Sequence, residues 1–217
     1  MALDEGRGTA SLREGFVTNR AVRRAFTVMP ALALALLVAA IALGGSALQV
    51  AGGLAYGFFL STLVDYLLHR FWFHKGPHAP RVEAMTMRMA KLHLDHHDIP
   101  ASPKGAVNKV DATSTIILVL TVISLLLPGP NGFWLAACAG GATGALLLDL
   151  IHYGTHQLPM KAPILRFYKR HHMLHHYRDA TVNYATLFPP WDMVFGTYWD
   201  GRERPDRGDR SQRATAD

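Results

Sequence analysis

The sequence predicts an all-α integral membrane protein with four transmembrane helices in two hairpins and a histidine-rich cap on the cytoplasmic side. Half of the 217 residues are hydrophobic and only 18% are charged, which is below the roughly 25% of soluble domains. The hydrophobic residues are gathered in four long segments, whereas all twelve histidines lie between residues 69 and 176. A soluble helical protein with a very apolar core is the alternative that this composition disfavours.

The four apolar segments cover residues 26–47, 49–68, 112–128 and 132–151. A helix needs about 20 residues to cross the hydrocarbon core of a bilayer, with about 17 as the lower limit, so the third segment is marginal. Gly44, Gly45 and Ser46 predict a tight turn within the first hairpin, and "PGPNG" (128–132) predicts one within the second. We therefore expect one membrane-embedded domain over 26–200. It lies between a cytoplasmic N-terminal segment over 1–25, too polar for a cleavable signal, and a polar disordered tail over 201–217.

Basic residues are concentrated on one side of this arrangement. Neither hairpin turn carries a charge, whereas the opposite ends of the spans carry Arg13, Arg20, Arg23, Arg24, Arg70, Lys75, Arg81, Arg88, Lys91, Lys161, Arg166, Lys169 and Arg170. The positive-inside rule then places both termini and the 69–111 segment in the cytoplasm, at a bacterial inner membrane or the endoplasmic reticulum. Residues 81–93 have apolar side chains at helical spacing, which suits either a helix on the inner membrane surface or an ordinary packed helix.

The charge and the cysteine content exclude some partners and sites. The net charge of +6 does not indicate a nucleic-acid partner, because several arginines lie in the polar tail. The single cysteine, Cys138, excludes an internal disulfide and a cysteine-rich metal site. It lies in an apolar run, so we expect a small buried residue.

The histidines form two matching sets. Each set has a spaced pair at the end of a span, in "HRFWFH" or "HYGTH", followed by an HxxHH cluster, "HLDHH" or "HMLHH". Residues at i, i+3 and i+4 share one helix face, so we expect each cluster to direct three imidazoles at one point. The members of the first pair are five residues apart, which is about 140° on a regular helix, so the second is expected beyond the helix end. The ten motif residues are His69, His74, His93, His96, His97, His152, His156, His172, His175 and His176.

This number of imidazoles predicts a site for two metal ions. Neutral imidazole is a preferred ligand of zinc, iron and copper. Ten are too many for one ion but suit two ions with about five nitrogens each, and an octahedral ion with five protein ligands keeps one position open for dioxygen or water. Imidazole adds no ligand charge, so the ions stay strongly Lewis acidic. No catalytic residue is predicted beyond these ligands, and His78 and His171, outside the motifs, are expected to be ordinary polar side chains.

Two carboxylates lie one helical turn before a histidine pair. Asp65 precedes His69 by four residues, and Asp149 precedes His152 by three. A charge at the inner end of a span is costly and usually functional. We expect each carboxylate to accept a hydrogen bond from its histidine and so fix the tautomer and orientation of the ring. A carboxylate that only reaches interfacial water is the alternative.

These motifs resemble those of the fatty acid hydroxylase and sterol desaturase superfamily. The matching pieces are "HRFWFH", "HLDHH", "DLIHYGTH", "HHMLHHY" and "NYATLFPPWDMVFGT", which cover about residues 65–200. The "DxxHYxxH" form and the "WDxxFGT" ending are most similar to fatty acid 2-hydroxylases. The resemblance implies a membrane-bound di-metal oxygenase that uses dioxygen and external electrons to hydroxylate the carbon next to the carboxyl of an acyl chain. It also implies iron in the working enzyme, with zinc able to occupy the same site.

The resemblance points to four further residues and to one partner. Asn183 and Tyr184 match the family's "NY", and Trp191 and Asp192 lie in "WDxxFGT", so these four are candidates for substrate contact or site support. An aromatic anchor at the membrane interface is the alternative for Trp191. No haem-binding domain precedes the spans, unlike in the eukaryotic 2-hydroxylases, so a separate electron-transfer protein is expected. Ala185 follows "NY" where relatives commonly have glycine, which leaves the acyl specificity open.

Three other functions stay open from the sequence alone. A sterol or carotenoid hydroxylase or desaturase of the same superfamily would differ in its pocket, although carotenoid hydroxylases generally space the third pair one residue wider than His152 and His156. A metal transporter also uses intramembrane histidines, but here they lie at one end of the spans. A non-catalytic lipid-binding membrane protein has no use for ten ligands.

Overall fold

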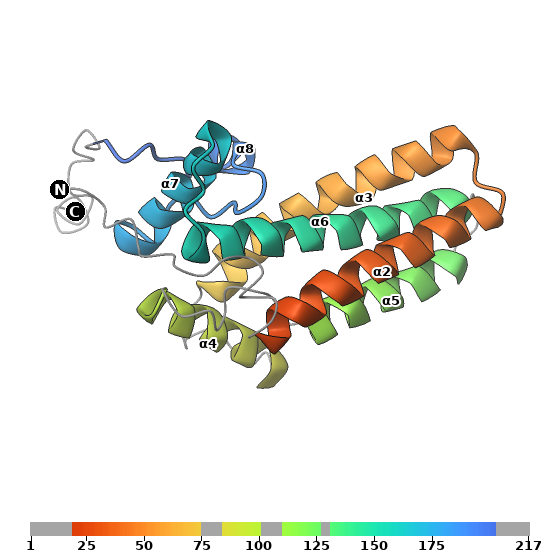
Figure 1. Cartoon of the computed structure of the whole chain (residues 1–217), viewed down its shortest axis with the longest axis horizontal. Coiled ribbons are helices and arrows are strands. Elements are labelled where there is room, and N and C mark those ends of the chain that lie inside the picture. The colour runs from red at the N-terminus through yellow and green to blue at the C-terminus, as the bar shows by residue number, and fades with distance from the viewer. Residues whose placement is uncertain (1–18, 75–83, 101–109, 127–130, 203–217) are drawn as a thin grey trace, which may run out of the picture.

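The computed structural model describes residues 19–74, 84–100, 110–126 and 131–202, and every regular element within these ranges is a helix. Helices α2, α3, α5 and α6 run side by side as a long bundle, and α4, α7 and α8 gather at one of its ends (Figure 1). The all-α prediction is confirmed for these residues; His78 and the 203–217 part of the tail lie outside them. The elements are α2 (Arg20–Ala42), α3 (Ala47–Leu68), the π-helix η1 (His69–Phe73), α4 (Ala84–Asp98), α5 (Val110–Leu126), α6 (Asn131–Gln157), α7 (Pro163–Tyr177) and α8 (Pro190–Val194).

Helices α2 and α3 form the first predicted hairpin. The side-chain oxygen of Asn19 accepts hydrogen bonds from the first turn of α2, so this helix begins six residues before the predicted span over 26–47. The chain reverses at Gly44, whose φ of +81° lies in the left-handed region that favours glycine. Ser46 then starts α3 through a capping box with Gln49. The predicted turn is therefore confirmed.

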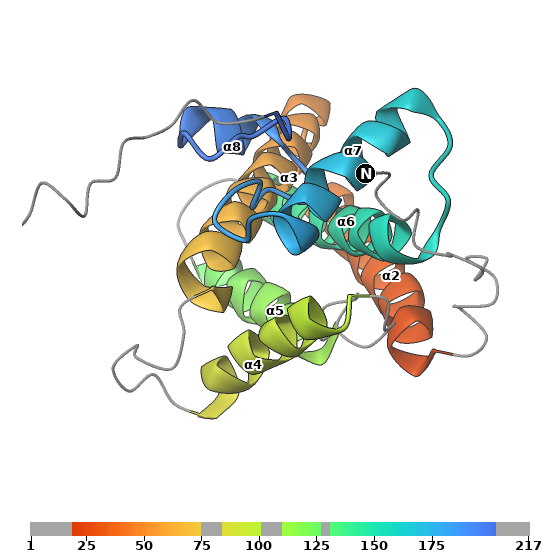
Figure 2. The same ribbon diagram turned by 90° about the vertical axis from the view of Figure 1, so that its left-hand side faces the viewer.

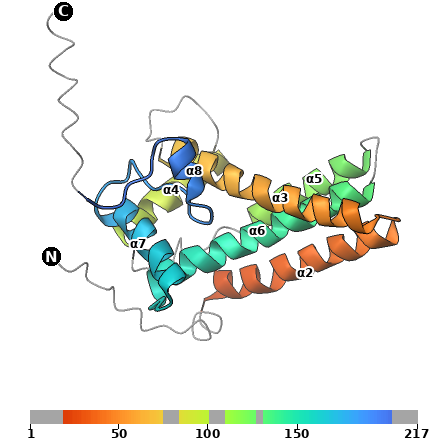
Figure 3. The ribbon, with the colours of Figure 1, turned by 90° about the horizontal axis from the view of Figure 1, so that it is seen from above.

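Helix α6 is the centre of the bundle and packs against α2, α3 and α5 (Figure 3). It approaches α3 closely because small residues face each other. A methyl group on Gly57 would overlap the backbone of Ala137, and a methyl group on Gly140 would overlap the carbonyl of Leu54. Small residues favour helix association in a bilayer, where close backbone packing takes the place of hydrophobic attraction. Cys138 is half-buried on α6 and packs against the core.

Three described helical segments are long and apolar enough to cross a membrane: Arg20–Ala42, Ala47–Phe73 and Asn131–Gln157. Helix α5 corresponds to the third predicted span and has 17 residues, which is at the lower limit of about 17. It lies along α2 and α6 and exposes Ile116, Val119 and Ile123, as a helix that faces lipid does. A membrane protein with three membrane-capable helices is thus supported, and the fourth span stays a prediction.

Two of the bundle helices extend past their predicted ends into the cap. The helical path of α3 continues into η1, and α6 runs on to Gln157 rather than ending near 151. Seen along the bundle, α4 and α7 face each other across the ends of α3 and α6 (Figure 2). Elements far apart in the sequence therefore meet at one end of the bundle, and these elements carry the two histidine sets.

Candidate metal centre

All ten motif histidines converge in two groups of five. Within each group, the candidate ligand nitrogens all lie within 4.8 Å of one another. This division into two groups of five is the one expected if the site holds two ions with about five nitrogen ligands each. The first group consists of His69, His74, His93, His97 and His175, and the second group consists of His96, His152, His156, His172 and His176.

The pair at the end of α3 reaches one group through a π-helix. A five-residue separation would turn the two rings about 140° apart on a regular helix, so His74 was expected beyond the helix end. The chain widens at His69–Phe73 into η1, with His74 as its C-terminal cap. A π-helix closes i→i+5 hydrogen bonds and turns less per residue than an α-helix, so residues five apart point in more similar directions than on a regular helix. His74 thus lies just past the helix end, as predicted, and the widened turn before it brings His69 and His74 together.

Each HxxHH cluster is divided between the two groups, so the expectation that it directs three imidazoles at one point is wrong. His93 and His97 belong to the first group, but His96 belongs to the second. The cluster "HMLHH" on α7 is divided in the same way: its middle histidine, His175, belongs to the first group and its other two belong to the second. Helix geometry explains this, because side chains at i and i+4 point about 40° apart, whereas those at i+3 and i+4 point about 100° apart.

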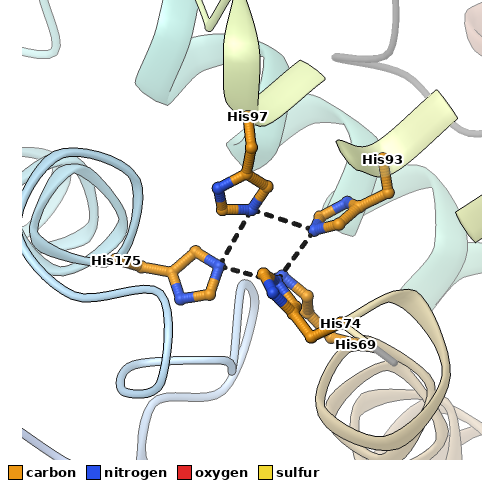
Figure 4. A group of neighbouring side chains, drawn as sticks. All are labelled: His69, His74, His93, His97 and His175. Carbon is orange, nitrogen blue, oxygen red and sulfur yellow. Dashed lines mark hydrogen bonds between the residues drawn. The ribbon is translucent and has the colours of Figure 1, made fainter. Parts of the chain in front are cut away.

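Four nitrogens of the first group form a closed square (Figure 4). The Nε2–Nε2 distances along its edges are 3.1 Å for His74–His93, 3.1 Å for His93–His97, 3.2 Å for His97–His175 and 3.1 Å for His175–His74. Ligands about 2.1 Å from a common ion are about 3.0 Å apart at right angles and about 3.4 Å apart in a tetrahedron. The square therefore fits an octahedral or square-pyramidal ion. The remaining residue, His69, lies beside His74, and its buried Nε2 has no hydrogen-bond partner.

The second group has similar spacing, but its close Nε2–Nε2 contacts form an open row of four nitrogens rather than a closed square. Its Nε2–Nε2 distances are 3.0 Å for His96–His156, His156–His172 and His172–His176. The fifth residue, His152, again has a buried Nε2 without a hydrogen-bond partner. A buried nitrogen without a partner is costly, and a metal ion at the centre would satisfy it. The two groups thus fit a pair of metal ions by both distance and chemistry.

The cap keeps its imidazoles in the form that binds metal. Burial lowers the pKa of His74 to about 4 and that of His97 to about 3, against an ordinary value of 6.5. Burial, together with the neighbouring imidazoles, also lowers the pKa of His93, His172 and His175. These residues are therefore neutral at pH 7, with a lone pair available for a metal ion.

Backbone carbonyls, not carboxylates, orient two rings of the first group. His69 Nδ1 donates to the carbonyl of Tyr184, and His175 Nδ1 donates to the carbonyl of Val182 at 2.6 Å. Each of these bonds fixes the tautomer that leaves Nε2 free for a metal. The expected hydrogen bond from His69 to Asp65 is therefore wrong. The Asp65 carboxylate instead accepts from the backbone N–H of Thr186 at 3.4 Å, because the chain after α7 folds between α3 and the first group.

The other predicted carboxylate, Asp149, lies on α6 one turn before His152, and its side chain is buried. This placement fits a carboxylate that serves the site rather than one that reaches interfacial water. The orienting role predicted for Asp149 stays a proposal.

The four residues taken from the resemblance lie in the segment beside the first group or contact that segment. Asn183, at a φ of +54°, exchanges hydrogen bonds with the backbone of Trp199, and its amide donates to the carbonyl of His171. Trp191 packs on α3 and donates through its indole nitrogen to Thr62 Oγ1 at 3.0 Å. The side chain of Asp192 is fully buried. These contacts hold the chain from 182 to 199 against the first group.

Sequence reasoning missed the role of His171. Its ring lies outside both groups, as predicted, but it is buried and pairs with Asp192 at 3.0 Å instead of being an ordinary polar side chain. The missed partners Val182 and Thr197 act through a backbone carbonyl and a single hydroxyl, which no spacing rule identifies. Only the placement of Thr197 in the "WDxxFGT" ending could have drawn attention to it.

Comparison with known proteins assigns the chain to a family. The model of the fatty acid hydroxylase family matches residues 54–197. The chain belongs to the fatty acid hydroxylase family. The matched region contains all ten histidines and the supporting segment around Asp192, so the family assignment and the two groups concern the same part of the chain.

Individual relatives agree with this assignment. The chain is 32% identical over 143 residues to the ceramide very long chain fatty acid hydroxylase SCS7 of Saccharomyces cerevisiae, covering 65% of this chain and 36% of that protein. It is 32% identical to the fatty acid 2-hydroxylase of Homo sapiens, covering 65% of this chain and 38% of that protein. The dihydroceramide fatty acyl 2-hydroxylase FAH2 of Arabidopsis thaliana is 33% identical, with 66% and 59% covered. The match thus spans little more than a third of the yeast and human relatives.

A solved structure has the same fold. The structure of full length scs7p, in which only the hydroxylase domain is visible, aligns with a TM-score of 0.69 and 25% sequence identity. The alignment covers 81% of this chain and 65% of that chain. The bundle and its cap are therefore a fold shared within the family.

Proposed function

We propose that the protein is a membrane-bound di-metal oxygenase that hydroxylates a lipid acyl chain at the carbon next to the carboxyl group. The observation that carries this proposal is the pair of five-histidine groups at one end of membrane-capable helices. The relatives named as fatty acid 2-hydroxylases support the choice of reaction and position. The same names weigh against the metal transporter and the sterol or carotenoid enzyme.

The reaction requires two electrons from outside the chain. Dioxygen, an acyl C–H bond, two electrons and two protons give one C–OH group and one water molecule. Two iron ions, when bound, would supply the activation of dioxygen, and zinc would occupy the same nitrogens without redox activity. A separate electron-transfer protein is the proposed electron source.

The side chains of the two groups have three tasks. Ten neutral imidazoles hold the ions without adding negative charge. The Val182 and Tyr184 carbonyls orient His175 and His69, so that Nε2 of each ring faces the site. Burial of the histidines excludes water, which protects the reaction from side products.

The position of the site suits a lipid substrate. In the proposed topology α5 is a fourth span, so both hairpin turns lie on one side of the membrane and the cap lies on the cytoplasmic side. An acyl tail then enters from the bilayer beside the bundle, while its polar head stays at the interface. The domain over 26–200 forms this unit.

Lipid mass spectrometry tests the proposal. Cells that express the chain with a compatible electron donor should gain fatty acids heavier by one oxygen, and fragmentation should place the hydroxyl on the second carbon. His152→Ala, which removes a nitrogen from the second group, is the matched control and should abolish the product. A loss of two hydrogens instead would indicate a desaturase, and unchanged lipids beside a measured metal flux would indicate a transporter.

A further inference from the structure

A short segment behind the first histidine group connects that group to a buried acid. Val182, Asn183, Tyr184, Ala185 and Thr186 are all buried, although they belong to no regular element. The carbonyls of Val182 and Tyr184 accept the Nδ1–H groups of His175 and His69. Any contact that holds this 182–186 segment in place therefore also orients two candidate metal ligands, His69 and His175.

The carboxylate of Asp192 holds the segment on its other side. Its Oδ1 accepts from the backbone N–H of Tyr184 at 2.8 Å and from the hydroxyl of Thr197 at 2.7 Å. Its Oδ2 accepts from the backbone N–H of Ala185 at 3.0 Å and from His171 Nε2 at 3.0 Å. Four donors thus surround one carboxylate whose residue is 0% exposed, so its charge is well stabilised without water.

The direction of each hydrogen bond around Asp192 follows from its charge. An ionised carboxylate only accepts, so His171 carries its proton on Nε2 and the Thr197 hydroxyl donates to Asp192. The Tyr66 hydroxyl, 2.9 Å from Thr197 Oγ1, must then donate to Thr197. Arg70 Nη1 in turn donates to the Tyr66 oxygen at 2.8 Å. The chain of donors begins on a guanidinium and ends on a carboxylate, so the order is fixed by charge at both ends.

We propose that Asp192 is a positioning residue that holds the ligand histidines of the first group, and not those of the second group, through the 182–186 segment. Tyr184 forms the direct link, because its N–H donates to Asp192 and its carbonyl accepts from His69. The carbonyls of the 182–186 segment bond to His69 and His175 of the first group, whereas the buried Nδ1 atoms of His172 and His176 in the second group have no hydrogen-bond partner. The inference rests on the proposed two-metal site and adds that the support from Asp192 reaches only one of the two ions.

The test is metal retention by Asp192→Asn in the purified full chain. Asparagine keeps one acceptor oxygen but presents an N–H₂ group toward donors that need an acceptor. Wild-type protein should hold two ions, and the variant should lose one of them about 10–100-fold more readily to a chelator, the usual effect of a partner behind a ligand. Asp200→Asn is the matched control, because this residue pairs with Arg202 at the surface and should release both ions at the wild-type rate.

Combined variants identify the ion that is lost. His152→Ala disables the second group and leaves one ion in the first; adding Asp192→Asn should release that ion as well. His69→Ala disables the first group, and adding Asp192→Asn should then leave the remaining ion unaffected. His171→Gln, whose amide still donates to the carboxylate, should retain both ions, whereas His171→Leu should weaken one.

The outcomes separate this inference from the proposed function. A wild-type chain that binds no pair of ions contradicts both. A wild-type chain with two ions and an Asp192→Asn variant with unchanged release contradicts the positioning role alone, as does equal loss from both groups in a folded variant. If Asp192→Asn does not fold, Thr197→Val carries the test, since it removes one donor while keeping the shape of the side chain. Release of one ion several-fold faster is expected, and unchanged release overturns the inference.

Discussion

His97 and His176 stack on each other across the boundary between the two histidine groups, with ring centroids 4.0 Å apart and ring planes 19° apart. His97 belongs to the first group and His176 to the second. The two proposed ion sites are therefore adjacent and are separated by this stacked pair of imidazole rings, although their ligand sets have no member in common. Separate ligand sets make the ions separable by mutation.

The first prediction concerns the crossed histidines. His96 lies between ligands of the first group in the sequence but belongs to the second group in space, and His175 shows the reverse. We therefore expect His93→Ala and His175→Ala to remove the same ion, so that the double variant still holds one ion per chain. His93→Ala with His96→Ala should remove both ions, although both changes lie within one motif.

Metal analysis of the purified variants checks this expectation. His93→Ala with His97→Ala is the control, because both residues belong to the first group and one ion should remain. One ion retained in the His93→Ala, His96→Ala double variant would mean that each HxxHH cluster serves a single ion, as the sequence alone suggests.

The second prediction is a dependence of stability on pH in the metal-free protein. Burial lowers the pKa of His74 to about 4 and that of His97 to about 3, from 6.5. Below pH 6.5 the unfolded chain takes up protons that the folded protein does not, so the free energy of unfolding decreases as the pH falls from about 6.5 toward about 4. From about pH 7.5 upward both states are neutral and this contribution is constant.

Thermal unfolding in detergent at several pH values between 4.5 and 7.5 measures this effect. The melting temperature of the metal-free protein should be nearly level around pH 7.5, begin to fall as the pH approaches 6.5 and fall more steeply below that. Replacing His74 and His97 together by glutamine should flatten part of the slope, and an unchanged slope in that variant would assign the pH dependence to other groups.

The third prediction concerns the contact between α3 and α6. A methyl group on Gly140 would overlap the carbonyl of Leu54, whereas one on the adjacent Gly141 would find its nearest atom, the carbonyl oxygen of Gly57, at 4.0 Å. Gly140→Ala should therefore push the helices apart and destabilise the protein by about 1–3 kcal/mol. Gly141→Ala should be neutral or stabilising by up to about 1 kcal/mol, because alanine favours the helix. Melting temperatures in detergent compare the two, and equal effects would contradict the close packing.

Spacing predicted the ten histidines but not the arrangement of the two groups. The identity of the residues follows from their number and their motifs, since ten imidazoles in repeated patterns have few other uses. Helix geometry separates His96 in direction from His93 and His97, but which histidines of other helices each of them meets depends on the direction of α4 relative to α7. That direction is set by packing, so a pattern within one segment could not reveal the full composition of the two groups.

Local geometry limited the prediction at two further residues. His74 lies past the end of the helix, as predicted, but the π-helix η1 that precedes it was not foreseen because a regular helix was assumed. Asp65 was paired with His69 because the two are close in sequence. The carbonyl of Tyr184, 115 residues away from His69, takes that hydrogen bond, and such a distant backbone partner has no signal in composition or spacing.

The last prediction concerns the topology, which decides whether the proposed chemistry faces the cytoplasm. The first histidine pair follows α3, and the second pair ends α6, so α5 and α6 lie between the two sets along the chain. In the structure both sets meet at one end of the bundle, which requires α5 and α6 to run in opposite directions. If α6 spans the membrane, α5 must therefore also cross it, in the opposite direction. Because α5 has 17 residues, a bilayer thicker than this helix would be thinned beside α5.

Single cysteines at Lys91, Asn131 and Arg202, each in a Cys138→Ala background, test this arrangement with an impermeant thiol reagent in intact cells. Lys91 and Arg202 are exposed on the cap and Asn131 starts α6 at the opposite end of the bundle. If α5 crosses the bilayer and the cap is cytoplasmic, only the cysteine at 131 should be labelled, and permeabilised cells should show labelling at all three positions. Labelling at 91 and 202 but not at 131 would be compatible with the shared metal site, but it would show that the protein has the opposite orientation in the membrane. Labelling at 202 without 91 would place the two ends of the cap on opposite sides of the membrane, and neither the four spans nor the two-ion site could then be correct.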